Sequence, residues 1–161
     1  FIGVVSDYAL QFAFGPPSGP VEGHKESGFL KKTLKPAGKG PGADNPAALG
    51  PAGTMNISPG AHATLLSELF LRQGDRFSHL MQPYPDAGSD YALGMGVITH
   101  EKLGTCYAHA GSNTIWLSLV NICPGADIAF VIDTNSANES HMQSLKQVAS
   151  DILRSTAENA P

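Results

Sequence analysis

The sequence predicts an α+β fold in which an antiparallel sheet is flanked by helices. Residues 104–133 contain three segments rich in β-branched, aromatic and other apolar residues, joined by two short turns. Residues 138–156 carry apolar side chains at helical spacing, and a second stripe of this kind follows Ser58. Strands joined by tight turns pair antiparallel, and an apolar helical stripe packs on the nearest sheet face.

Size and charge narrow the possible roles. The 161 residues, 42% of them hydrophobic, are enough for a single domain spanning 1–161. The 10 basic and 14 acidic residues give a net charge of -4 without a run of like charges, which argues against a nucleic-acid partner. No apolar stretch reaches the roughly 18 residues that span a bilayer, and no signal peptide is recognisable, so we expect no membrane partner. Because the first residue is Phe1 and not Met, we expect a preceding segment.

The sequence of the N-terminal third predicts mostly loop. Phe1–Val5 favours a short strand, and Tyr8–Phe14 a short helix or coil. Residues 15–53 hold seven of the twelve prolines and nine of the eighteen glycines, so no long helix or strand is expected there, only a small strand over Gly28–Leu34. A loop of this length in a compact domain usually serves as a lid, a binding rim or a wrapping segment.

The middle of the chain returns to regular structure. Ser58 is a suitable N-cap and Pro59 suits the first position of a helix that Gly74 ends. Its apolar stripe is Leu65, Leu66, Leu69 and Phe70. A short helical turn follows from Arg76 to Gln82, and Tyr91–Ile98 predicts a strand.

The three-strand unit comes next. Its first turn holds Ser112, Asn113 and Thr114, and its second turn is residues 124–127. The segments 115–123 and 128–132 are apolar on both alternating faces, which is typical of interior strands. If the first turn centres on Asn113, Cys123 lies opposite residue 102 or 103. Cys106 is then roughly 10–13 Å away, too far for a disulfide, so the sequence predicts two free thiols.

A helix over residues 138–156 closes the chain. Ser136 and Glu139 have the spacing of a capping box. The apolar stripe comprises Met142, Leu145, Val148, Ala149, Ile152 and Leu153.

Three stretches carry a family resemblance. Residues 91–97 (YALGMGV), 107–114 (YAHAGSNT) and 128–135 are similar to the C-terminal portion of the serine β-lactamase-like hydrolases. This superfamily comprises class C β-lactamases, penicillin-binding proteins, D-aminopeptidases and esterases. Gly23-His24 and residues 50–58 resemble the part that precedes the family's sheet. The resemblance covers about residues 14–154 and implies that residues 91–156 form the sheet and C-terminal helix of that fold. It also implies a periplasmic or extracellular protein.

The family's chemistry needs three motifs, and one of them is present. The motifs are Ser-x-x-Lys, Tyr-x-Asn or Ser-x-Asn, and Lys-Thr-Gly or His-x-Gly. The third is found here as His109-Ala110-Gly111, whereas Ser-x-x-Lys occurs nowhere, and the Ser-x-Asn at Ser136 lies out of the family's order. We therefore expect no activity from the chain alone. It would become a serine hydrolase only with a second chain or N-terminal segment that carries the missing motifs.

The resemblance also implies roles for the residues around this motif. His109 stands where many members carry lysine, and the backbone N–H of Ser112 is an oxyanion donor. Ala110, Gly111 and Asn113 bind substrate, with Gly111 letting a substrate backbone lie close to the strand. Because a histidine is neutral much of the time, peptide, amide or ester substrates are favoured over β-lactams. No cofactor is implied.

Other interpretations remain open beside the hydrolase. The chain could be a non-catalytic module that keeps the sheet to bind peptides or to assemble. Without the resemblance, the sequence predicts a surface or hydrogen-bonded histidine at His109, and turn residues at Ser112 and Asn113. The remaining histidines have no metal-ligand spacing, so no metal site is expected.

Overall fold

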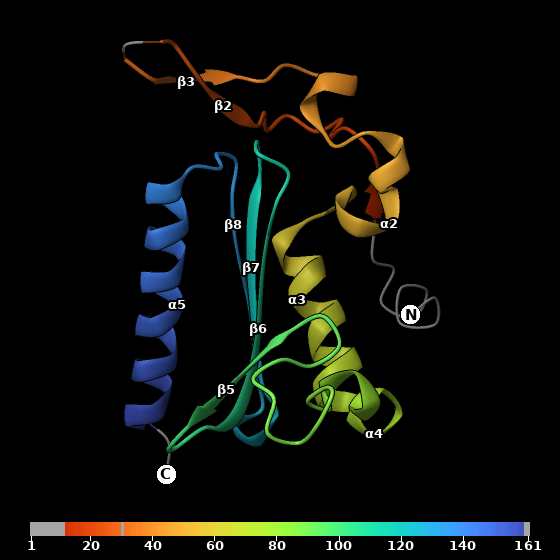
Figure 1. Ribbon diagram of the computed structural model, residues 1–161, viewed down its shortest axis with the longest axis vertical. Coiled ribbons are helices and arrows are strands. Elements are labelled where there is room, and N and C mark those ends of the chain that lie inside the picture. The colour runs from red at the N-terminus through yellow and green to blue at the C-terminus, as the bar shows by residue number, and fades with distance from the viewer. Residues whose placement is uncertain (1–11, 30, 160–161) are drawn as a thin grey trace.

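The computed structural model describes residues 12–29 and 31–159 (Figure 1). Its centre is a four-stranded antiparallel sheet in the order β5-β6-β7-β8. The strands are β5 (Gly96–His100), β6 (Gly104–Ser112), β7 (Leu117–Cys123) and β8 (Ile128–Thr134). The α+β class and the three consecutive strands that the sequence predicts are confirmed.

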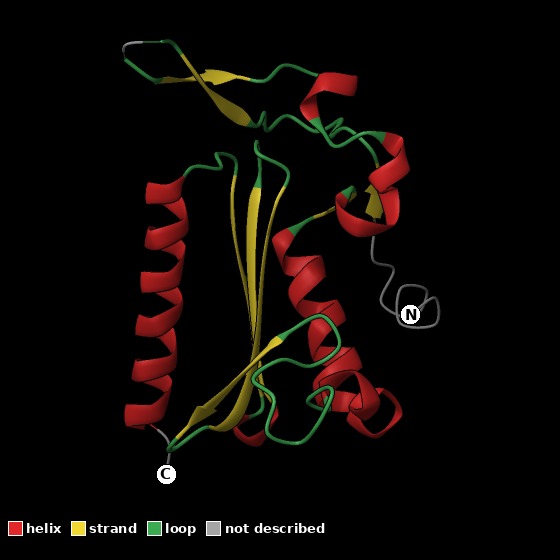
Figure 2. Cartoon of the chain, viewed as in Figure 1, coloured by secondary structure: helices red, strands yellow, loops and turns green. Residues whose placement is uncertain are grey.

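Two helices cover opposite faces of this sheet. The C-terminal helix α5 (Glu139–Asn159) lies on one side of the strands and α3 (Pro59–Ser67) on the other (Figure 2). Helix α3 continues into a π-helical turn, η3 (Glu68–Arg72), and is followed by α4 (Gly74–Phe77) and the 3₁₀ turn η4 (Ser78–Met81). Ser58 caps α3 as predicted, because its Oγ accepts the N–H of Ala61 over 3.2 Å.

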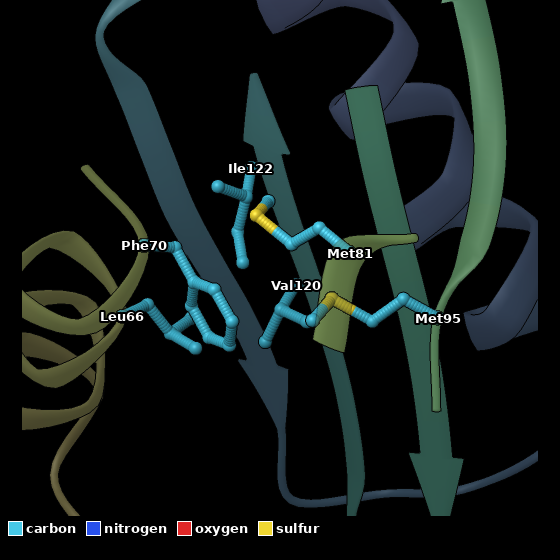
Figure 3. Packing of buried hydrophobic residues seen from close by; sticks show 6 residues of the cluster. All are labelled: Leu66, Phe70, Met81, Met95, Val120 and Ile122. Atoms are coloured by element: carbon cyan, nitrogen blue, oxygen red, sulfur yellow. The ribbon is translucent and has the colours of Figure 1, made fainter. Parts of the chain in front are cut away.

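The alternation of β7 explains why its sequence is apolar on both faces, with Ser118 and Asn121 as its two polar residues. Val120 and Ile122 point towards α3 and pack with Leu66 and Phe70 (Figure 3). Leu117 and Leu119 point the other way and pack with Leu145 and Ala149 of α5. A strand buried on both faces gains from apolar side chains at every position.

The register of β6 and β7 corrects the prediction of free thiols. Tyr107 pairs with Ile122, so Cys106 and Cys123 lie directly opposite one another and form a disulfide with Cα atoms 4.2 Å apart. The turn occupies residues 113–116 and does not centre on Asn113, which moves the partner of Cys123 by three or four residues. Because both faces of β7 are apolar, the sequence pattern could not distinguish these registers.

Strand β8 differs from the interior strand that its sequence suggests. Both of its faces are partly covered, but among the described strands it pairs only with β7. Its outer edge therefore carries backbone groups that no described strand satisfies. Just beyond its end, the carbonyl of Asn135 accepts the N–H of His24 over 2.7 Å.

The N-terminal region has short strands and no long element. Residues 12–14 are a strand, β1 (Phe12–Phe14), which pairs with β4 (Met55–Ile57), so the prediction of helix or coil is wrong there; Phe1–Val5 lies outside the described residues. The strands β2 (His24–Ser27) and β3 (Thr33–Pro36) form a hairpin beyond the end of the main sheet (Figure 1). The predicted strand at 28–34 is displaced because Gly28, with φ of 114°, belongs to the turn. Helix α2 (Gly50–Gly53) and the 3₁₀ turns η1 (Pro41–Ala43), η2 (Ala47–Leu49) and η5 (Pro124–Ala126) complete the fold.

Two further boundaries differ from the predictions. Tyr91 makes only an isolated bridge to Gly96, because the chain turns at Gly94 with φ of 98°, and β5 begins after this turn. Helix α5 is capped by Asn138, whose Oδ1 accepts the N–H of His141 over 2.8 Å. The hydroxyl of Ser136 is buried and has no hydrogen-bond partner among the described residues, so the capping box does not form. Val148 is 47% exposed and lies outside the buried stripe.

Candidate functional site

The outer edge of β6 is open where the His-x-Gly motif lies. Strand β5 pairs with β6 from Gly104 to Ala108 and extends no further. Residues 109–112 therefore have a strand neighbour on one side only, β7, in the described part of the chain. An open edge next to a paired strand is the geometry that accepts an added extended peptide.

The phase of the hydrogen bonds decides which backbone groups face this edge. The N–H of Asn113 donates to the carbonyl of Trp116 over 3.3 Å. Directly opposed residues alternate between hydrogen-bonded and non-bonded pairs, and the Asn113–Trp116 pair is bonded. The backbone N–H and C=O groups of His109 and Gly111 therefore bond to β7. The N–H and C=O groups of Ala110 and Ser112 then point outward. The Ser112 N–H thus lies on the open edge and does not bond to β7.

The side chain of His109, and any β-carbon added at Gly111, belong to the sheet face that α3 covers. His109 is opposite Val120, which packs towards α3. A β-carbon built on Gly111 would have Nε2 of His109 as its nearest neighbour, 3.8 Å away. The imidazole and the space above Gly111 are therefore adjacent. His109, Ala110 and Ser112 are exposed, and Gly111 and Asn113 are half-buried.

The five predicted site residues, 109–113, lie along the open edge of β6 and not in an enclosed pocket; this edge is here called the shelf. A hollow of about 380 Å³ lies further along β5 and β6, lined by Val97, Thr99, Thr105 and Tyr107 together with the loop of residues 83–90. None of the five predicted site residues lines it. Burial raises the pKa of the Tyr107 hydroxyl, which keeps that side chain neutral.

The side chains of Ser112 and Asn113 are engaged in the turn. Oδ1 of Asn113 accepts the N–H groups of Ile115 and Trp116 over 3.2 and 2.7 Å. Its Nδ2 donates to Oδ1 of Asp44 over 2.9 Å. Oγ of Ser112 accepts the N–H of Thr114, which adopts a left-handed φ of 71°. Residue type alone indicates this structural role for both residues, and the backbone of Ser112 stays available for the edge.

A histidine and an aspartate that sequence reasoning did not connect lie on the same sheet face. Gly111 pairs with Ser118 and Ser118 pairs with Asp133, so Asp133 is two strands, or roughly 10 Å, from Gly111. His62 of α3 interacts with this carboxylate. Burial lowers the pKa of His62, and the charge of Asp133 opposes that shift. No sequence signal links the two residues, because only the packing of α3 on β8 brings them together.

The described residues hold no complete nucleophilic site. No lysine in the described part of the chain bonds to a serine; Lys32 bonds to Glu26 and Lys102 to the carbonyl of Ala157. Within residues 12–29 and 31–159, no group of three His, Cys, Asp or Glu side chains could hold a metal ion. The edge of β6 thus presents outward backbone groups, but no Ser–Lys pair lies among the described residues.

No protein-family model matches this chain, and no curated protein or solved structure matches it either.

Proposed function

We propose that this chain is one part of a serine hydrolase of the β-lactamase-like superfamily. It acts on amide, peptide or ester bonds through an acyl-serine intermediate. The chain supplies the strand with His109-Ala110-Gly111 and the oxyanion-hole N–H of Ser112. A second chain or an N-terminal segment supplies Ser-x-x-Lys and Tyr-x-Asn, which this sequence lacks.

The observation that carries the proposal is the open edge of β6 at residues 109–112. A substrate added there as an extended strand would bond to the outward groups of Ala110 and Ser112. Its scissile carbonyl oxygen would then lie against the Ser112 N–H. Gly111 leaves the space for its backbone, and His109 stands beside that space to polarise the substrate or hold its carboxylate.

The edge of β8 supports the need for a completing segment. Strand β8 is seven residues long, apolar over most of its length and paired on one side only among the described strands. An apolar strand edge of this kind pairs readily with another chain. The missing strands and the nucleophile would dock at this edge and face the side of the sheet on which His109 lies.

The test begins with the protein as isolated from its source. Intact mass and a denaturing gel should reveal a second polypeptide or a longer chain. A serine-directed fluorophosphonate should label that polypeptide, or the added segment, and no residue of 1–161. Label on a serine of this chain would overturn the assignment of roles.

Gly111→Ala then tests the shelf in the completed enzyme. The added methyl makes only an ordinary contact with His109, so the fold should persist, but it fills the space assigned to the substrate. We expect ester hydrolysis to fall on the order of 100-fold, the loss that follows from a misplaced substrate. Gly96→Ala is the matched control, because it adds the same group on β5, where Ala108 O is 3.6 Å away. Equal activity of the two variants would contradict the proposed role of Gly111.

One alternative is favoured by the same open edges. The sequence has no Ser-x-x-Lys motif, and a sheet with two edge segments that no described strand pairs can bind peptides or assemble without catalysis. In that case the source material contains no partner that reacts with a fluorophosphonate, and peptide binding persists in His109→Ala.

A further inference from the structure

The β2–β3 hairpin gathers half of the positive charge of the chain on one projecting arm. Residues 24–40, here called the arm, contain five of the ten basic residues and one acidic residue, a net charge of +4. The remaining residues carry five basic and thirteen acidic groups, a net charge of -8. The hairpin lies beyond the ends of the main strands and outside the two helices that flank the sheet (Figure 1). The overall charge of -4 therefore hides a strongly basic element.

The pairing of the arm places like charges opposite one another. Lys25 pairs with Lys35 in the β2–β3 register, so both ammonium groups project from the same face. Neither makes an ion pair in the described part of the chain, whereas Lys32 is bonded to Glu26 over 2.8 Å. Like charges directly opposite each other destabilise a strand pair, and a bound anion would relieve this repulsion.

The tip of the arm presents an aromatic ring to solvent. Phe29 is 101% exposed and contacts no core cluster. It lies between the strands that carry the lysines, in the turn after Gly28. An exposed aromatic side chain flanked by ammonium groups is the combination with which peripheral proteins enter the headgroup region of an anionic bilayer.

We propose that the arm docks on a bilayer surface that contains anionic phospholipid. Lys25, Lys31, Lys35 and Lys39 contact the headgroups, and Phe29 enters the boundary between headgroups and acyl chains. The arm has no arginine and a single aromatic side chain, which fits a lipid surface better than a nucleic acid, whose binding relies on arginine and several stacking rings. The sequence predicts no membrane partner because it has no spanning segment and no recognisable signal peptide. Neither property reports how charge is distributed in space. Among the described helices none is long and apolar enough to cross a bilayer.

Vesicle sedimentation with the full chain tests the proposal. The vesicles contain one part phosphatidylglycerol to two parts phosphatidylcholine, with pure phosphatidylcholine as the neutral comparison. We expect binding to the anionic vesicles only, weakened by salt. The double variant Lys25→Gln/Lys35→Gln should bind about 25-fold more weakly, since each lysine near such a surface contributes about fivefold. Phe29→Ser should also weaken binding to the anionic vesicles, and this weakening should persist at high salt.

The matched control removes the same charge from another surface. Lys146→Gln/Arg154→Gln alters two exposed residues of α5 and should bind as the unaltered chain does. Circular dichroism checks that all variants fold. Absence of binding to anionic vesicles, or equal weakening by the control variant, would overturn the proposal. Tighter binding to heparin or duplex DNA than to vesicles, unaffected by Phe29→Ser, would make the arm a polyanion site and the membrane assignment wrong.

Discussion

Asn113 and Asp44 are joined by a hydrogen bond of 2.9 Å between Nδ2 and Oδ1, although 69 positions separate them in the sequence. The bond attaches the Gly/Pro-rich segment to the end of β6, next to the open edge that we assign to the substrate. The same asparagine holds the turn that follows, because its Oδ1 accepts two backbone N–H groups.

Asn113→Ala removes all three of these hydrogen bonds. Asp44→Ala removes only two bonds, the one from Nδ2 of Asn113 and the one from the N–H of Asn45. At about 1 kcal/mol for each bond, we expect Asn113→Ala to lower the free energy of unfolding by about 3 kcal/mol. Asp44→Ala should cost less, and Asp44→Asn, which keeps an acceptor oxygen, less still. Urea unfolding followed by circular dichroism measures the order, and a reversed order would contradict the central role of Asn113 in the turn.

The Cys106–Cys123 disulfide should contribute measurably to stability. The double variant Cys106→Ala/Cys123→Ala opens a loop with a sequence separation of 17. The chain-entropy relation for a loop of this size gives a loss of about 3 kcal/mol. Both sulfurs are buried, so reductant should act only on unfolded protein. A thiol assay in denaturant without reductant should detect no free thiol; two reactive thiols would show that the bond is absent.

Gly23 lies against the ring of Trp116, and a larger residue has no space there. A β-carbon on Gly23 would meet the Ile115 side chain and would lie 2.6 Å from Nε1 of Trp116. We expect Gly23→Ala to lower the free energy of unfolding by about 1–3 kcal/mol, the usual cost of overpacking. The fluorescence of Trp116, the single tryptophan, should shift as its surroundings open. Gly19→Ala serves as the control, because no atom lies within 4 Å of its added group.

His62 should make the stability depend on pH below neutrality. Burial lowers the pKa of this histidine in the folded chain, so the unfolded chain binds the proton more readily. The contribution of His62 is therefore complete above the unfolded pKa of about 6.5 and is lost as the pH falls through the folded pKa. Unfolding in urea between pH 7.5 and pH 5 should show this loss.

Two variants test whether His62 causes this pH dependence of stability. His62→Gln should make the free energy of unfolding change less between pH 7.5 and pH 5. Asp133→Asn removes the charge that raises the pKa of His62, so the histidine should titrate at a lower pH, which an NMR titration of the ring protons can follow. An unchanged midpoint in Asp133→Asn would contradict the interaction between the two residues.

Local sequence signals predict the elements that depend only on neighbouring residues. Ser58 and Pro59 mark the start of α3 because a cap needs a hydroxyl three residues before the N–H that it accepts. Residues 124–127 mark the turn between β7 and β8 for a similarly local reason, with Asp127 in the left-handed region at φ of 51°. His109-Ala110-Gly111 is recognisable as a motif because its three residues are adjacent in the sequence.

The sequence by itself therefore determined the fold class, three consecutive strands, the long C-terminal helix, the start of α3 and the position of the candidate motif. Only the tertiary structure decided the register that joins Cys106 to Cys123, the open edges of β6 and β8, the proximity of His62 to Asp133, and the gathering of lysines on the arm. Each of these depends on how distant segments pair or pack. Because a strand that is apolar on both faces accepts several registers equally well, its sequence cannot choose between them, and the contacts with the rest of the fold make the choice.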